Sequence, residues 1–234
     1  MKVTYIEHSC FSVELQKVIL LFDYFKGELP EFDENKTIYV FSSHNHHDHF
    51  DISIFQLLKR YQNVKYIFSK DIKRKFGRKF FNTNGVEDEV YENIEFININ
   101  QTLQISDLTI ETLRSTDEGV AFIITAEDKT IYHAGDLNLW WWNGRDKSDN
   151  ERARENYEKE INKIKKRHFD IAFVVLDPRQ GEEFYLGFDY FMKNTDTDKV
   201  YPIHCWNDIS VSERLKGMDC SEKYRDKICS YQFN

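Results

Sequence analysis

The chain has 234 residues, of which 41% are hydrophobic and 15% aromatic, and it carries a formal net charge of −8. The negative charge disfavours a general nucleic-acid binder, because an acidic surface repels phosphate backbones. Since no run of eighteen apolar residues and no apolar leader over Met1–Phe22 is present, we expect no membrane span, no membrane partner and no signal peptide. Cys10, Cys205, Cys220 and Cys229 match no metal or redox spacing, so we expect reduced thiols in a cytoplasmic protein.

Apolar, β-type runs predict strands throughout the first half of the chain. These strands are Lys2–Glu7, Phe11–Leu15, Val18–Phe22, Ile38–Phe41 and Lys65–Phe68. Helical periodicity predicts helices at Ile52–Tyr61 and Asp71–Phe80, and the lysines and arginines of the second are interpreted as its solvated face.

Strands dominate the next stretch, and helices alternate with strands towards the end. The predicted strands are Ile94–Ile99, Thr109–Leu113, Val120–Thr125, Thr130–Tyr132, Ile171–Leu176 and Lys199–Ile203, and the predicted helices are Asn150–Arg167, Gly187–Lys193 and Ser210–Gly217. This order favours two sheets packed together with helices outside. No Pro-rich or Ser-rich linker interrupts the chain, so we expect one domain over residues 1–234.

A dense histidine cluster follows the predicted strand Ile38–Phe41. Residues 43–49 read SHNHHDH and hold four of the eight histidines. If the strand geometry continues, His44 and His46 point to the same side and share one cation, because strand side chains alternate with period 2. Asp48 and His49 are then displaced along the chain, towards a second cation. Imidazole and carboxylate are ligands for Zn, Fe or Mn.

Two further strand ends offer ligands that complete such a site. Asp136 follows the strand Thr130–Tyr132 and the turn residue Gly135, and its two oxygens could bridge two cations. His204 ends the strand Lys199–Ile203. Considered alone, Asp136 is compatible with an ordinary aspartate in a turn, and His204 is compatible with a histidine in the core. Together with the cluster they favour a metal site.

The cluster His44-x-His46-x-Asp48-His49, the later Gly135-Asp136 and the terminal His204 resemble the metallo-β-lactamase superfamily. The segment from Glu7 to Phe11, which includes His8, resembles more weakly the branch of ascorbate-6-phosphate lactonase-like hydrolases. The resemblance implies a four-layer αββα sandwich, a fold of the α/β class, with the site at one edge of the sheets.

The resemblance implies how the ligands divide. His44 and His46 belong to a first metal site, Asp48, His49 and His204 belong to a second, and Asp136 bridges them. A histidine is expected between the cluster and Gly135-Asp136 as a further ligand of the first site, but none lies between His49 and His133.

The matching region offers Asp117 as a replacement, with Glu118 second; both also fit an ordinary turn. An added carboxylate would bring a two-cation centre close to neutral and favour Mn or Fe over Zn. Without it the first site is weak and one cation remains. We therefore expect one or two divalent ions (Zn, Mn or Fe).

The predicted reaction is hydrolysis of an ester, lactone or phosphoester of a small molecule, because metal binding lowers the pKa of water to roughly 7. Asp48 can orient the hydroxide and handle a proton, and His8 could reach the mouth of the site. Arg179 could hold an anionic group of the substrate, and Trp141, from Trp140-Trp141-Trp142, could form a pocket wall.

Other interpretations stay open. A mononuclear-iron oxidoreductase resembling persulfide dioxygenases, or a non-catalytic metal-binding protein, would fit a weak first site. His47, His133 and His168 are predicted not to be ligands, the last because it would end the helix Asn150–Arg167. A homo-oligomer is also compatible with the sequence.

Overall fold

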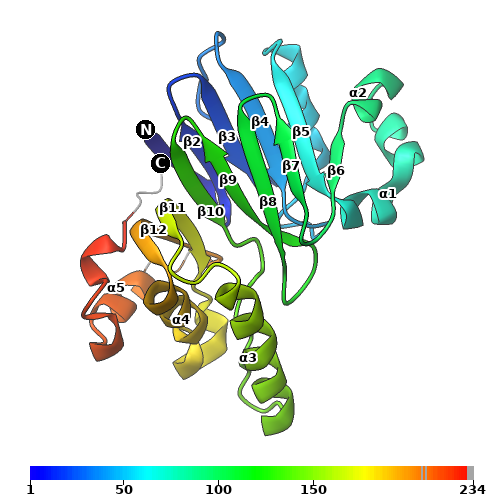
Figure 1. The fold of residues 1–234 in the computed structure, drawn as a ribbon. Coiled ribbons are helices and arrows are strands. Elements are labelled where there is room, and N and C mark those ends of the chain that lie inside the picture. Colours follow the sequence, from blue (N-terminus) through cyan, green and yellow to red (C-terminus); the bar gives the residue numbers. More distant parts are fainter. Residues whose placement is uncertain (207, 209, 231–234) are drawn as a thin grey trace.

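The computed structural model describes residues 1–206, 208 and 210–230, and these form two six-stranded sheets (Figure 1). The first sheet has the order β1-β2-β3-β4-β5-β6. Its strands are β1 (Lys2–Glu7), β2 (Cys10–Glu14), β3 (Val18–Phe22), β4 (Thr37–Ser42), β5 (Val64–Ser69) and β6 (Glu95–Ile97). β1, β2 and β3 are antiparallel, whereas β3 to β6 run parallel.

The second sheet has the order β12-β11-β10-β9-β8-β7. Its strands are β7 (Thr102–Ile105), β8 (Leu108–Arg114), β9 (Val120–Ala126), β10 (Lys129–His133), β11 (His168–Val175) and β12 (Asp196–Ile203). β10, β11 and β12 run parallel, and the remaining pairs are antiparallel.

Helices lie outside the two sheets. Figure 1 shows α1 (Lys70–Thr83) and α2 (Asp88–Glu92) beside β5 and β6, and α3 (Lys147–Asn162), α4 (Leu186–Asn194) and α5 (Ser210–Lys216) on the side of β11 and β12. Short 3-10 helices complete the chain: η1 (Ile52–Lys59), η2 (Pro178–Glu183), η3 (Asp219–Ser221) and η4 (Arg225–Lys227). Among the described residues, no helix is long and apolar enough to cross a bilayer.

The side chains of β4 point alternately into two hydrophobic cores, which explains the layered arrangement of sheets and helices. Tyr39 and Phe41 point into the core between the sheets, while Ile38 and Val40 point into a second core under η1, α1 and α2. Both faces of the strand are therefore buried, which is typical of parallel strands covered by helices. The predicted αββα sandwich is confirmed.

Most predicted elements are present, and the differences have local causes. Ile52–Lys59 winds as a 3-10 helix, and α3 begins at Lys147 and ends at Asn162, short of the predicted Arg167. Lys166 adopts a left-handed conformation (φ 62°), which ends the helical path and starts β11 at His168. The sequence missed β7, because this edge strand is largely exposed, and α2, which is little more than one turn.

Candidate metal centre

The polar side chains of the candidate site follow the carboxyl ends of parallel strands. Asp23 follows β3, His44 follows β4, Asp136 follows β10, Asp177 follows β11 and His204 follows β12. Parallel strands present their carboxyl ends at one sheet edge, which is where open α/β sheets bind ligands. The two sheets therefore bring five sequence-distant residues to one edge.

A first group of donor atoms comprises His44, His46 and Asp136. Their possible ligand atoms lie within 4.8 Å of one another. His44 Nε2 is 3.0 Å from His46 Nδ1 and 3.4 Å from Asp136 Oδ2. The His44 side chain is fully buried, whereas that of His46 is 39% exposed. The first group therefore opens to solvent on the His46 side.

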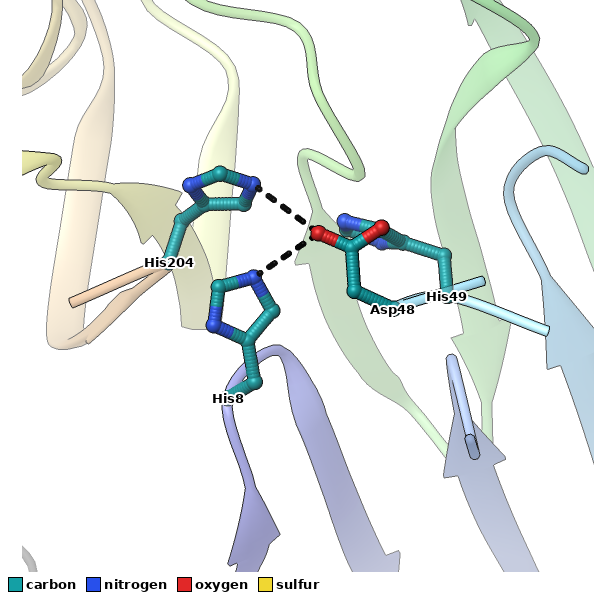
Figure 2. A group of neighbouring side chains, drawn as sticks. All are labelled: His8, Asp48, His49 and His204. Atoms are coloured by element: carbon teal, nitrogen blue, oxygen red, sulfur yellow. Dashed lines mark ion pairs between the residues drawn. The ribbon is translucent and has the colours of Figure 1, made fainter. Parts of the chain in front are cut away.

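A second group comprises His8, Asp48, His49 and His204, whose possible ligand atoms also lie within 4.8 Å of one another (Figure 2). Asp48 Oδ2 is 3.6 Å from His8 Nε2 and 3.9 Å from His204 Nε2. His8, His49 and His204 are buried. The sequence predicted three of these four as ligands and His8 as a catalytic residue.

Asp136 lies between the two groups. Its Oδ2 faces His44, while its Oδ1 is 3.1 Å from His49 Nε2 and 3.4 Å from His204 Nε2. Burial acts to raise the pKa of Asp136, but the rings of His49, His204 and His44 outweigh it and hold the pKa well below its usual value. The carboxylate thus offers one ionised oxygen to each group.

Several buried donor atoms at this edge have no hydrogen-bond partner within the protein. They are His8 Nε2, His49 Nε2 and Asp136 Oδ1, of which the last two lie 3.1 Å apart without hydrogen-bond geometry. A buried polar atom without a partner is costly, and imidazole and carboxylate lone pairs that converge on one point suit a cation. The residues present therefore fit one or two divalent ions bound by nitrogen and oxygen.

Two buried carboxylates orient the histidines. Asp23 Oδ2 is 2.8 Å from His49 Nδ1 and also accepts a hydrogen bond from Ser43 Oγ, which lies 2.9 Å from His44 Nδ1. Asp177 Oδ2 is 2.9 Å from His204 Nδ1. Such contacts leave each Nε2 directed at the group, as carboxylates do for metal-bound histidines in proteins.

Sequence reasoning missed Asp23 and treated Asp177 only as the neighbour of Arg179. A signal was present in both cases, because each aspartate comes within two residues of the end of an apolar strand, as His44 does. Asp23 also adopts a positive φ of 47°, as His8 (53°) and His204 (63°) do. Non-glycine residues in this strained region cluster at functional sites.

Asp117 lies beside the first group and not within it. Its Oδ2 is 3.8 Å from His46 Nδ1, and its side chain is about half exposed. The turn from Ser115 to Gly119, closed by a backbone hydrogen bond of 3.3 Å, holds it at the rim. Glu118 Oε2, at 3.9 Å from His46 Nε2, accepts a hydrogen bond from Asn45. Asp117 therefore lies at the rim of the first group, and its role as a ligand stays a prediction.

The remaining histidines differ in surroundings. His47 is 93% exposed. His133 is buried at the end of β10, where its Nε2 donates to the carbonyl of Ser9. His168 begins β11 and does not end a helix, so the reason given for excluding it was wrong; it faces Asp196 and Asp198 on the surface.

An open cavity of about 480 Å³ lies over the donor groups. Its lining includes His46, Asp48, Asp117, Asp136 and His204 from the site, and Trp140, Trp142, Trp206, Arg145 and Arg179 around them. Trp141 does not line this cavity, because its ring packs against the core under Arg154, 4.9 Å from the guanidinium. Its two neighbours stack on each other and take the place predicted for Trp141.

The family model described as "Beta-lactamase superfamily domain" matches residues 2–140, more than half of the chain. The chain belongs to this family. The predicted superfamily is therefore confirmed, whereas the ascorbate-6-phosphate lactonase-like branch stays a prediction.

Similar proteins carry names that agree with the predicted class of enzyme. A "UPF0173 metal-dependent hydrolase" of Alkaliphilus metalliredigens is 28% identical over 149 residues, which span 59% of this chain and 64% of that protein. "UPF0173 metal-dependent hydrolase YtkL" of Bacillus subtilis is 28% identical over 80% of this chain and 76% of its own length. Igni18, "a novel metallo hydrolase" from Ignicoccus hospitalis, has a similar fold, with a TM-score of 0.61, 16% identity and coverage of 99% of this chain and 98% of its own.

Proposed function

We propose that this protein is a metal-dependent hydrolase that cleaves an ester, lactone or phosphoester of a small molecule. The observation that carries the proposal is the position of Asp136, whose two oxygens face two separate donor groups at the base of an open cavity. Two divalent ions held there would polarise a substrate oxygen and supply hydroxide at neutral pH, because bound water has a pKa near 7.

The residues of the two donor groups and their neighbours have separate proposed roles. His44, His46 and Asp136 would hold one ion, and Asp48, His49 and His204 the other, while Asp23 and Asp177 fix the imidazole orientations. Asp48 belongs to the second group and also lines the cavity, so its carboxylate can accept a proton on the substrate side. Asp117 stays a further candidate ligand from the rim.

The cavity wall supports a substrate with a flat or apolar part and an anionic group. Trp140 and Trp142 are stacked with parallel rings, and the Arg179 guanidinium lies 4.5 Å from the centre of the Trp206 ring. Arg179 is held by Asp177 through Nε and one terminal nitrogen, which leaves other N–H groups for a ligand. Arg145 forms no ion pair with any described residue, so its charge is available to an anion.

The experiment combines metal analysis with turnover. The protein, grown with added Zn, Mn or Fe, is assayed against p-nitrophenyl esters, lactones and p-nitrophenyl phosphodiesters. We expect metal-dependent turnover that Asp136→Asn abolishes together with part of the metal content. Asp33→Asn serves as the control, because the Asp33 side chain is exposed, accepts hydrogen bonds only from Asn35 and belongs to neither group.

The outcomes separate the alternatives. Oxygen uptake by an iron-loaded protein without hydrolysis would favour the mononuclear-iron oxidoreductase. Metal binding with neither activity would favour a non-catalytic metal-binding protein. Asp136→Asn with the metal content and turnover of the unmodified protein would contradict the proposed centre.

A further inference from the structure

The turn between β1 and β2 delivers a single imidazole into the second donor group. His8 and Ser9 connect Glu7 to Cys10, and the register of the hairpin shifts just before them, between Tyr5 and Glu7. His8 adopts a left-handed conformation with a φ of 53°. A non-glycine residue in this region is strained, so the turn holds His8 in a conformation that the surrounding structure must enforce.

The turn is tied to the loop that carries Asp136. The backbone N–H of His8 donates to Tyr5 Oη at 2.9 Å. The carbonyl of Ser9 accepts from His133 Nε2 at 2.9 Å, and His133 Nδ1 accepts from the backbone N–H of Gly135. Because Gly135 precedes Asp136, these contacts fix the position of His8 relative to the bridging carboxylate.

The His8 ring points at the other members of the second group (Figure 2). Its side chain is 5% exposed, and its Nε2 has no hydrogen-bond partner. That atom lies 3.6 Å from Asp48 Oδ2, and the His8 ring centre lies 4.3 Å from that of His204. A buried ring nitrogen without a partner, facing a carboxylate and other imidazoles, is placed as a metal ligand is.

We infer that His8 is a metal ligand rather than a catalytic residue, and that it makes the second group the tighter of two unequal sites. With His8 the second group has three imidazoles and Asp48, and Asp136 Oδ1 lies next to it. The first group has only two imidazoles and Asp136 Oδ2, and one of them, His46, is partly exposed.

The difference in the number of ligands between the two groups predicts how firmly each group would hold its ion. Metal sites with four protein ligands are closed, whereas sites with three keep a position open for water or substrate. The second group would therefore retain its ion, and the first group would exchange its ion and face the substrate. This inference rests on the metal-binding part of the proposed function and is independent of hydrolysis.

The test is a titration of metal-free protein with Co²⁺, followed by its absorbance and by competition with a chelator of known affinity. For the unmodified chain we expect one tight equivalent and a second, weaker one. His8→Asn should weaken the first equivalent at least 100-fold, since it removes a direct ligand and even indirect partners change affinity about 10–100-fold. His46→Ala should weaken only the second equivalent.

His8→Asn is chosen because asparagine tolerates the left-handed conformation. Its side chain is also too short to replace Nε2. Asp33→Asn, at an exposed residue outside both groups, is the control and should leave both equivalents unchanged. The circular dichroism and thermal unfolding of each metal-free variant report whether it folds.

A second variant covers the case in which His8→Asn does not fold. His8→Gly removes the strain and leaves space for free imidazole, which should restore the Co²⁺ spectrum of the first equivalent. Two results would overturn the inference: a first equivalent of unchanged affinity in a folded His8 variant, or a first equivalent that depends on His46 instead of His8. Neither result requires a substrate, so a failure here is distinct from a failure of the proposed hydrolysis.

Discussion

Asp23 Oδ2 lies 2.8 Å from His49 Nδ1 and, through the hydroxyl of Ser43, also reaches His44. One fully buried carboxylate thus orients a histidine in each donor group. Burial acts to raise the pKa of Asp23, but His133, His49 and His44 outweigh it and hold the pKa below its usual value. The aspartate is therefore ionised where it faces the rings.

Asp23→Asn should weaken metal binding by about 10–100-fold, because one acceptor oxygen becomes a donor and the imidazoles lose their fixed orientation. Chelator competition with Zn²⁺ measures the affinity. Asp33→Asn is the matched control, since Asp33 is exposed and its side chain accepts hydrogen bonds only from Asn35. Equal affinities for Asp23→Asn and the unmodified protein would remove Asp23 from this role.

Gly119 packs against the backbone that carries His44. A Cβ there would lie 2.0 Å from the Ser43 carbonyl oxygen and 2.6 Å from His44 Cβ, and Gly119 has a φ of +69°. Gly119→Ala should cost about 3 kcal/mol of unfolding free energy or more, from strain and overpacking together. Gly85→Ala has a similar φ and nothing within 4 Å, so it should cost only about 1 kcal/mol. Urea unfolding of both variants checks the difference, and equal costs would contradict it.

Asp177 links stability to pH. Burial acts to raise its pKa, but hydrogen bonds from His204 and Arg179 outweigh burial and lower the pKa from 3.8 to about 2. The folded state therefore favours the ionised form. The stabilisation, about 2 kcal/mol, is complete well above pH 4 and is lost as the pH falls through about 2.

Asp177→Asn should accordingly destabilise the metal-free protein by about 2 kcal/mol at pH 6. The difference in unfolding free energy between this variant and the unmodified protein should decrease as the pH falls below about 4. Denaturant unfolding at a series of pH values measures this difference in free energy. A difference in unfolding free energy that stays constant down to the lowest pH at which the protein folds would show that ionised Asp177 does not stabilise the folded state.

Arg145 lines the cavity without an ion-pair partner among the described residues. Arg145→Gln should raise KM for an anionic ester about tenfold, the effect of losing one hydrogen bond to a charged group, and leave kcat unchanged. KM for a neutral ester should not change. Arg152→Gln removes the same charge from the exposed face of α3 and serves as the control. A rise in KM for both esters, or for both variants, would contradict an anion contact.

The strand-end residues explain how much of this site could be predicted from the sequence. Apolar runs identify β4, β10 and β12, and the polar residues that follow them, His44, Asp136 and His204, are chemically distinctive. Parallel strands then bring those ends together, so the donor groups follow from local pattern and topology.

Other parts of the site depend on tertiary packing, which a local sequence pattern does not predict. Asp23 resembles an ordinary loop residue until β3 pairs with β4 and places it under His49. The three tryptophans diverge as expected, but only the packing under Arg154 decides that Trp141 faces away from the cavity. The role inferred for His8 requires the hairpin to be closed against the Gly135 loop.

We propose that the two donor groups that share Asp136 hold two divalent ions. Equilibrium dialysis of the metal-free protein against excess Zn²⁺ or Mn²⁺, followed by elemental analysis, counts the bound ions. We expect two equivalents per chain in the unmodified protein and fewer in Asp136→Asn. No bound metal in the unmodified protein, or the same two equivalents in Asp136→Asn, would contradict it.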